Sequence, residues 1–344
     1  MSDRERKKKR WPIVLAIVVA AILVVALIAV IVWNSILDTY IRRVDENAPT
    51  LSSMDIENIL KETDPSGGGP VLDPEDVTTP TVPVETVPMD ENVLNILLVG
   101  QDRREGAPRM HSDAMILCTF NLENKTLVMT SFLRDMWVYI PGYFNERINV
   151  PYMLDGFPLL NQTLQYNFGV SADYNIEVDF AGFEKAIDSV GGVDLVLTSK
   201  EANHLNTNNN TGWNLKEGLN HLTGEQALAY SRIRILDSDF QRTGRQRAVL
   251  NALIEKAKDL DIAQMLDLVG VLLPLVSTDM TNAEINTCIF KILPVLPELE
   301  IISQRVPIDD AFANASIQGK SVLVMDIVDL EKNQKFLTDT IGSE

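Results

Sequence analysis

The chain has 344 residues, with 30 Lys and Arg against 48 Asp and Glu, which gives a formal net charge of −18 at pH 7. Residues 1–10 hold six basic and two acidic side chains, so the other 334 residues hold 24 basic and 46 acidic ones, a net charge of −22. We expect no nucleic-acid partner, because non-specific binding depends on Lys and Arg that neutralise phosphates. Two cysteines and three histidines also exclude a disulfide scaffold and a histidine-rich metal site.

A transmembrane helix is expected near the N-terminus. No charged residue occurs from Trp11 to Leu37, and twenty apolar residues at about 1.5 Å each span a hydrocarbon core of roughly 30 Å. The basic tail at 1–10 precedes this stretch, so the positive-inside rule places the tail in the cytoplasm and the C-terminal part outside. A cleaved signal peptide is the alternative, but the apolar run is too long and lacks a small-x-small cleavage site. We therefore expect a single span at 11–34.

Residues 35–92 are expected to form an extracellular stalk and a Pro/Gly-rich linker. Three consecutive glycines at 67–69 and six prolines from 65 to 88 disfavour both a helix and a packed core. Such a spacer would hold the following part of the chain away from the membrane surface.

From residue 93 onward, short apolar runs alternate with stretches of helical periodicity. The expected elements in chain order are strands at 95–100, 114–120 and 126–132, a strand–helix–strand unit over 174–197, helices at 242–258, 262–273 and 283–293, strands at 301–306 and 321–324, and a last helix at 330–341. Strands interleaved with helices in this way predict a single α/β domain at 93–344 with a central mixed sheet.

Five arginines lie within residues 232–247, whereas no Lys occurs between Glu217 and Glu255. Arg offers a planar fork of donors that matches phosphate or carboxylate oxygens, and it stays charged when desolvated. The cluster meets the start of the expected helix at 242–258, whose first backbone amides also favour an anion. We expect an anion site here; the alternative is a solvated face, or pairing with carboxylates such as Asp237 and Glu225. The five residues are Arg232, Arg234, Arg242, Arg245 and Arg247.

Charged residues also lie at the ends of the first three expected strands. Asp102 follows the first strand, Asp113 precedes the second and Arg134 closes the third. Loops at strand ends are where α/β sheets place ligands, and carboxylates near a phosphate suit Mg²⁺. Each Asp could equally cap a turn or pair with a neighbouring arginine, so the spacing alone does not establish a metal site.

Six motifs follow one another in a fixed order between residues 95 and 258: NILLVGQDRR, HSDAMIL, SFLRD, RIN, GFEKAIDSVGGVDL and LTGEQALAYSRIRILDSDFQRTGRQR. They resemble the ordered motifs of the LytR–CpsA–Psr family of membrane-anchored cell-wall ligases. The resemblance implies one α/β/α domain with a central mixed sheet, preceded by a transmembrane helix and a linker. It also implies the cell membrane as the location, in a single-pass type II arrangement with the C-terminal domain extracellular.

The activity that the resemblance implies is a phosphotransferase of Gram-positive cells. It would attach a glycopolymer of the teichoic acid or capsule type to peptidoglycan through a phosphodiester. The donor would be a polyprenyl-pyrophosphate-linked glycan held in membrane lipid, and polyprenyl phosphate would leave. The alternatives are a non-catalytic wall sensor that binds polyprenyl pyrophosphate, and a Mg²⁺-dependent lipid pyrophosphatase.

The same resemblance assigns roles to individual residues. Asp102 and Asp113 would hold Mg²⁺, and Asp239 would be the base that deprotonates the acceptor hydroxyl. The implied pyrophosphate ligands are Arg134, Arg234 and Arg242, with Arg147, Arg232 and Arg245 as helpers.

Three positions depart from the family pattern. His111 stands where the family has an arginine, for which Arg109 could substitute; Leu133 replaces a proline, and Arg147 replaces a lysine. The lipid tail would need an apolar tunnel that the sequence does not identify, and we interpret the apolar run at 269–276 as ordinary core.

The two cysteines lie in apolar contexts. The position of Cys118 within an apolar strand predicts a buried thiol, and nothing in the sequence supports a bridge between Cys118 and Cys288.

Overall fold

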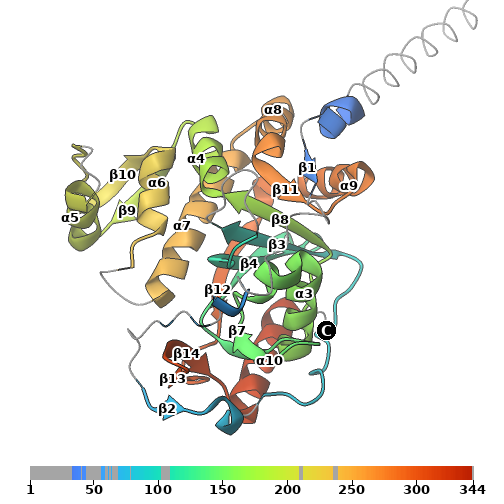
Figure 1. The fold of residues 1–344 in the computed structure, drawn as a ribbon. Coiled ribbons are helices and arrows are strands. Elements are labelled where there is room, and N and C mark those ends of the chain that lie inside the picture. The colour runs from blue at the N-terminus through green and yellow to red at the C-terminus, as the bar shows by residue number, and fades with distance from the viewer. Residues whose placement is uncertain are drawn as a thin grey trace, which may run out of the picture.

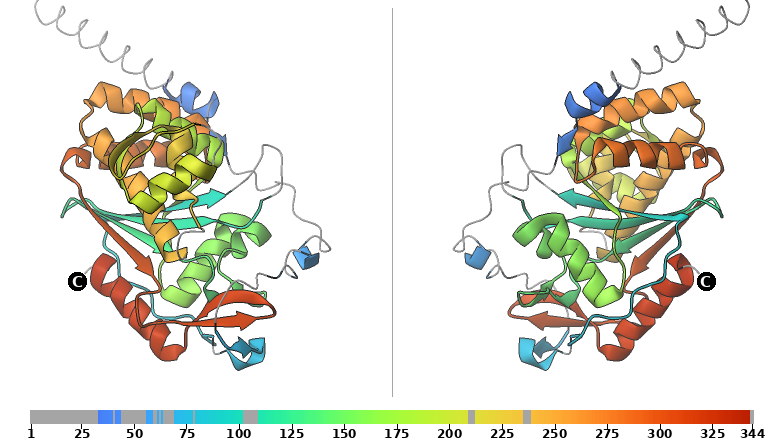
Figure 2. Two further views of the ribbon diagram at one scale, coloured as in Figure 1. Left: turned by 90° about the vertical axis from the view of Figure 1, so that its left-hand side faces the viewer. Right: turned by 90° about the vertical axis from the view of Figure 1, so that its right-hand side faces the viewer.

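The computed structural model describes residues 33–39, 41–43, 56–58, 61, 63, 69–77, 79–101, 109–208, 212–234 and 239–342. Its centre is a seven-stranded sheet with the strand order β1-β11-β8-β3-β4-β5-β12. Helices cover both faces of this sheet, so the domain has three layers (Figures 1 and 2). The predicted α/β domain with a central mixed sheet is therefore confirmed.

The sheet is mixed because β3 pairs in parallel with β8 but antiparallel with β4, while β5 pairs antiparallel with β4 and parallel with β12. Leu97 and Leu117 on its two middle strands are fully buried. Strands that are covered on both faces read as continuous apolar runs, which is why the sequence predicts them well. The strands are β1 (Arg42–Arg43), β3 (Val93–Gln101), β4 (Ala114–Asn121), β5 (Thr126–Phe132), β8 (Tyr174–Asp179), β11 (Val276–Thr278) and β12 (Glu300–Val306).

Two helices, α3 (Pro151–Phe168) and α10 (Ile327–Ile341), pack on one face of the sheet. On the other face lie α7 (Asp239–Lys258), α8 (Ile262–Leu272) and α9 (Asn282–Ile292). The sequence does not predict α3. Its first turns contain Pro151 and Pro158, and the chain leaves the helical conformation at Gly156, where φ is 64°. These residues interrupt the helical periodicity on which the prediction depends.

Three smaller units surround the central layers. One lobe, at the left in Figure 1, packs Leu195, Leu205 and Leu222 against Val249 of α7. A C-terminal hairpin and a second short hairpin lie below the sheet in Figure 1. The elements of these units and the remaining connections are β2 (Val71–Leu72), β6 (Trp137–Tyr139), β7 (Asn145–Arg147), α4 (Phe180–Ser189), β9 (Val193–Leu197), α5 (Ser199–Asn208), β10 (Gly218–Leu222), α6 (Gly224–Ser231), β13 (Ala313–Ile317), β14 (Lys320–Val324) and the 3₁₀ turns η1 (Pro74–Asp76), η2 (Leu273–Leu275) and η3 (Leu296–Glu298).

Parts of the expected stalk and linker belong to the folded domain. Residues 33–39 are helical, Leu37 is fully buried, and Trp33 Nε1 donates a hydrogen bond of 2.8 Å to Asn286 Oδ1 of α9. In the Pro-rich stretch, Val87 is only 2% exposed. Isolated apolar residues in polar segments have no periodicity, so the sequence gives no sign that they are buried.

Within the described residues, none of the helices combines the length and the apolar character needed to cross a bilayer. The cytoplasmic tail expected at 1–10 and most of the span expected at 11–34 lie outside those residues.

Candidate active site

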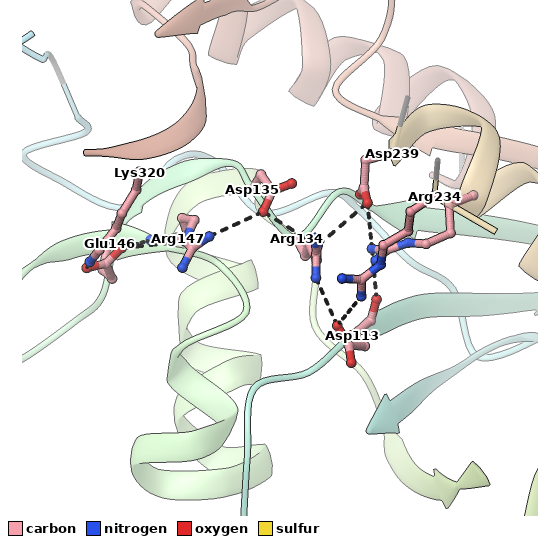
Figure 3. Close-up of polar contacts among 9 residues, drawn as sticks. Asp113, Arg134, Asp135, Glu146, Arg147, Arg234, Asp239 and Lys320 are labelled. Atoms are coloured by element: carbon pink, nitrogen blue, oxygen red, sulfur yellow. Dashed lines mark hydrogen bonds and ion pairs between the residues drawn. The ribbon is translucent and has the colours of Figure 1, made fainter. Parts of the chain in front are cut away.

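Charged residues from distant parts of the chain meet at one end of the central sheet. Asp113 immediately precedes β4, Arg134 lies two residues beyond β5, and Asp239 is the first residue of α7. Arg234 follows α6 in the segment that leads to α7. Figure 3 shows these four side chains pointing toward one another. The fold thus joins the arginine segment to the strand-end residues, as the sequence predicts for a ligand site.

Two carboxylates organise this cluster. Asp113 Oδ1 lies 3.0 Å from Arg134 NH1 and 3.1 Å from Arg234 NH2. Asp239 Oδ1 lies 2.8 Å from Arg242 NH2 and 3.6 Å from Arg134 Nε. The other carboxylate oxygen of Asp239, Oδ2, is buried and has no hydrogen-bond partner among the described residues. Asp239 therefore keeps one oxygen that could accept a proton from a ligand.

Arg242 is the most deeply buried arginine of the cluster, at 1% exposed. Its Nε and NH1 atoms have no hydrogen-bond partner among the described residues, although NH2 contacts Asp239 and the backbone oxygen of Asp113. Burial lowers the pKa of Arg242 to about 10, against the opposing effect of Asp239, so the side chain stays charged at neutral pH. Buried donors without acceptors are costly, and a bound anion would satisfy them.

A polar pocket of about 380 Å³ opens beside this cluster. Its charged lining consists of Asp113, Arg232, Arg234 and Arg242, so three arginines face one carboxylate. The guanidinium of Arg232 lies 4.3 Å from the centre of the Phe180 ring, which holds it against the pocket wall. Arg232 and Arg234 thus line the same space.

An apolar cavity of about 360 Å³ adjoins the polar pocket, between the sheet and the helices α4, α6, α7 and α8. Five residues line both spaces: Gly100, Ala114, Phe180, Ser231 and Gln246. The run at 269–276 was expected to be ordinary core, but Val269, Leu272, Leu273, Leu275 and Val276 line this cavity. That interpretation was incomplete: Leu273 and Val269 do belong to a core cluster, but an apolar run looks alike in sequence whether it faces other side chains or an open space.

Arg147 is connected to the charged cluster through Asp135. Its NH1 lies 3.7 Å from Asp135 Oδ1, and the same oxygen lies 3.5 Å from Arg134 Nε. Burial, together with the nearby Asp239, raises the pKa of Asp135, although Arg134 and Arg147 oppose this. Arg147 therefore reaches the site through Asp135, a residue to which the sequence assigns no role.

The position where the family has an arginine is held by His111. Burial and the charges of Arg147 and Arg134 lower the pKa of His111 to about 4, so its imidazole is neutral at pH 7. Arg109, the expected substitute, instead lies against Gly156 at the kink of α3, where an added Cβ would meet its NH1 atom at 2.0 Å.

Arg245 has structural partners. Its Nε lies 2.7 Å from Glu201 Oε1, and its NH1 donates to the Ile233 backbone oxygen at 3.0 Å. Although burial alone would raise it, the hydrogen bonds from Arg245 and Thr198 hold the pKa of Glu201 below its usual range. These contacts join α7 to α5, so they do not support the expected role of Arg245 in anion binding.

The expected Mg²⁺ ligands are only partly described. Asp102 lies outside the described residues, and within the described part no group of three or more His, Cys, Asp or Glu side chains could hold a metal. Both arginine contacts of the Asp113 carboxylate involve Oδ1, which leaves Oδ2 without a hydrogen bond among the described residues. Mg²⁺ commonly takes one or two carboxylate oxygens together with phosphate oxygens and water.

The fold and the site define an α/β/α protein with a cationic pocket beside an apolar cavity. The chain belongs to the LytR_cpsA_psr family, whose family model matches residues 71–339. This confirms the resemblance that the six motifs carry.

Two relatives illustrate the match. Regulatory protein MsrR of Staphylococcus aureus is 28% identical over 239 residues, which cover 68% of this chain and 71% of that protein. The polyisoprenyl-teichoic acid–peptidoglycan teichoic acid transferase TagT of Bacillus subtilis is 35% identical over 171 residues, 48% of this chain and 53% of TagT. A solved structure of TagT (YwtF) with bound octaprenyl pyrophosphate lipid has a TM-score of 0.58 and 25% identity, and the match covers 74% of this chain and 92% of that one.

Proposed function

We propose that this protein is a phosphotransferase that attaches a polyprenyl-pyrophosphate-linked glycopolymer to peptidoglycan. The observation that carries the proposal is the apolar cavity that adjoins the arginine pocket, with five lining residues in common. A cavity of about 360 Å³ lies within the range of about 300–1,000 Å³ that is typical of ligand sites. A lipid pyrophosphate has the apolar tail and the anionic head that these two spaces require. The ligand in the TagT structure and the name of the Bacillus relative support this class.

The charges of the site favour an anionic head group. Arg134, Arg232, Arg234 and Arg242 bring four positive charges against three carboxylates, those of Asp113, Asp135 and Asp239. The unsatisfied donors of Arg242 would bind phosphate oxygens and hold the scissile phosphorus beside Asp239. The arginines would also stabilise charge that develops in the transition state of phosphoryl transfer.

Asp239 would serve as the base. An acceptor hydroxyl attacks the glycan-linked phosphorus, a new phosphorus–oxygen bond forms, and the bond to the bridging pyrophosphate oxygen breaks. The hydroxyl proton passes to Asp239 Oδ2, the oxygen that has no hydrogen bond among the described residues, and polyprenyl phosphate leaves with the bridging oxygen. A carboxylate is a weak base, so it would act mainly by orienting the hydroxyl and taking its proton late.

Mg²⁺ and the membrane complete the proposal. Asp102 and Asp113 would hold Mg²⁺, which would neutralise charge on the pyrophosphate. A span at 11–34 would keep the protein in the cell membrane beside a donor that stays in the bilayer, with the catalytic domain outside the cell.

The full-length protein in detergent, incubated with a lipid-pyrophosphate glycan, Mg²⁺ and peptidoglycan fragments, tests this function. We expect a covalent glycan–muropeptide conjugate and released polyprenyl phosphate, and we expect chelation by EDTA to stop the reaction. Free glycan phosphate without a conjugate would instead establish a lipid pyrophosphatase. Binding of the lipid without turnover would establish a sensor and overturn the proposal.

A further inference from the structure

A buried ion pair joins the β6–β7 hairpin, whose last residue is Arg147, to the β13–β14 hairpin. Lys320, the first residue of β14, pairs with Glu146 of β7, and their side chains are 2% and 4% exposed. A buried lysine is costly unless its charge is compensated, so this position calls for a reason. The two residues are 174 positions apart, and Figure 3 shows the pair adjoining Arg147.

Arg147 lies between two carboxylates. Its NH1 is 3.7 Å from Asp135 Oδ1 on the side of the active site, and its Nε is 3.9 Å from Glu146 Oε1 on the other side. Both distances exceed a normal hydrogen bond, and the buried Nε of Arg147 has no hydrogen-bond partner among the described residues. Neither carboxylate is within hydrogen-bond distance of these guanidinium atoms. A small change in the charge of either carboxylate would therefore decide which of the two the guanidinium approaches.

Lys320 changes the balance between these carboxylates. Its Nζ binds Glu146 Oε2, while Glu146 Oε1 accepts the backbone N–H of Arg147 at 3.0 Å. Both oxygens of Glu146 are therefore occupied by donors other than the Arg147 guanidinium. The hairpin that carries Lys320 is fixed to the same region, because the N–H of Leu323 donates to the backbone oxygen of Asp135 at 2.8 Å.

We propose that Lys320 is a positioning residue: it neutralises Glu146 so that Arg147 stays directed toward Asp135 and the anion pocket. Without the charge of Lys320, Glu146 would attract the Arg147 guanidinium in a region of low dielectric, where Coulomb interactions are strong. The site would then lose one positive charge from the side of Asp135. The inference rests on the proposed function only in its choice of ligand.

The test uses the full-length protein and geranylgeranyl pyrophosphate as the probe, with calorimetric dissociation constants and melting temperatures for each variant. We expect Lys320→Met to weaken binding at least tenfold, and Glu146→Gln to stay within threefold of the wild type. The double variant K320M/E146Q should also bind within threefold of the wild type, because no carboxylate then competes for Arg147. Arg147→Met should weaken binding tenfold, and adding Lys320→Met to it should weaken binding no further.

A purely structural role gives a different pattern. Lys320→Met and Glu146→Gln each leave one buried partner alone, so both should lower the melting temperature, as should the control Glu201→Gln in the distant Arg245 pair. If affinity followed stability, Glu146→Gln would bind as weakly as Lys320→Met and the double variant would not recover; either result overturns the proposal. Should Lys320→Met fail to fold, Lys320→Gln, which keeps a donor for Glu146 without the charge, replaces it with the same expected direction.

A second measurement separates this inference from the proposed function. If the wild type does not bind the probe, the proposed function fails, but a crystal structure of the ligand-free Lys320→Met or Lys320→Gln variant still decides the role of Lys320. An Arg147 guanidinium hydrogen-bonded to Glu146 supports the inference. An Arg147 that stays within 4 Å of Asp135, as it is here at 3.7 Å, contradicts it.

Discussion

Arg242 NH2 lies 2.8 Å from Oδ1 of Asp239, three residues earlier in α7, and this contact leaves the second Asp239 oxygen, Oδ2, without a hydrogen bond among the described residues. One helix turn thus carries both a cation suited to the donor phosphate and an acceptor suited to a proton. The sequence predicted a helix start rich in basic residues, but α7 begins with Asp239 itself. An acidic first residue is favoured by the helix dipole.

Replacing Asp239 by Asn should separate binding from turnover. We expect Asp239→Asn to lower glycan transfer by about 10²–10⁴-fold, the usual contribution of a general base. Affinity for a prenyl pyrophosphate should not fall, because the change removes a negative charge from beside the anion pocket. Conjugate formation and calorimetric binding measure the two effects, and unchanged turnover would rule out the base role.

Two arginines of α7, three residues apart, should behave differently. Arg242→Met should weaken prenyl pyrophosphate binding by roughly 2 kcal/mol or more, about 30-fold, because it removes buried donors that have no hydrogen-bond partner among the described residues and that would bind the anion. Arg245→Met leaves Glu201 unpaired and should lower the free energy of unfolding by about 3–5 kcal/mol instead. Isothermal calorimetry and denaturant titration of both variants check this. Equal losses of affinity would show that Arg245 also binds the pyrophosphate.

Filling the apolar cavity should affect the lipid tail alone. Ala186 lines the cavity and lies away from the arginines, so Ala186→Phe should weaken geranylgeranyl pyrophosphate binding at least tenfold, or about 1.4 kcal/mol. Binding of inorganic pyrophosphate should stay within threefold. Val196→Phe, at a β9 position that is 69% exposed, is the matched control. A parallel loss for both ligands would show that the substitution distorts the head-group pocket.

The two thiols should make stability depend on pH in the alkaline range. Burial raises the pKa of Cys118 from 9.0 to about 12 and that of Cys288 to about 11. Above pH 9 the unfolded chain loses these protons while the folded chain keeps them, so the unfolded state binds fewer protons and stability falls as pH rises. The slope should reach about 1.4 kcal/mol per pH unit for each thiol. Cys118→Val should reduce the loss measured by denaturant titration between pH 9 and 11, and an unchanged slope would contradict a buried thiol.

The resemblance of short motifs named most of the charged residues that the fold brings together, but it could not show which of their donors lack partners. It gave Arg242 as a pyrophosphate ligand and Arg245 only as a helper; among the described residues, Arg242 keeps donors without partners beside the pocket, whereas Arg245 pairs with Glu201. It gave no role to Asp135, although this residue directly follows Arg134 in the motif SFLRD. The link between Lys320 and Glu146 has no local signal at all, because the two are 174 residues apart.

The sequence by itself determined five strands of the central sheet (β3, β4, β5, β8 and β12), the long helix of the arginine segment and the contrast between an acidic body and an arginine-only stretch. Each is a local property of composition or periodicity, which survives in any tertiary arrangement. Only the tertiary structure decided which donors of Arg242 and which oxygen of Asp239 lack a hydrogen bond among the described residues, and that the run at 269–276 borders a cavity. Asp113 and Arg234, 121 residues apart, meet because the fold brings the start of β4 and the segment after α6 to the same end of the sheet. Such contacts depend on the packing of whole elements, so no short stretch of sequence encodes them.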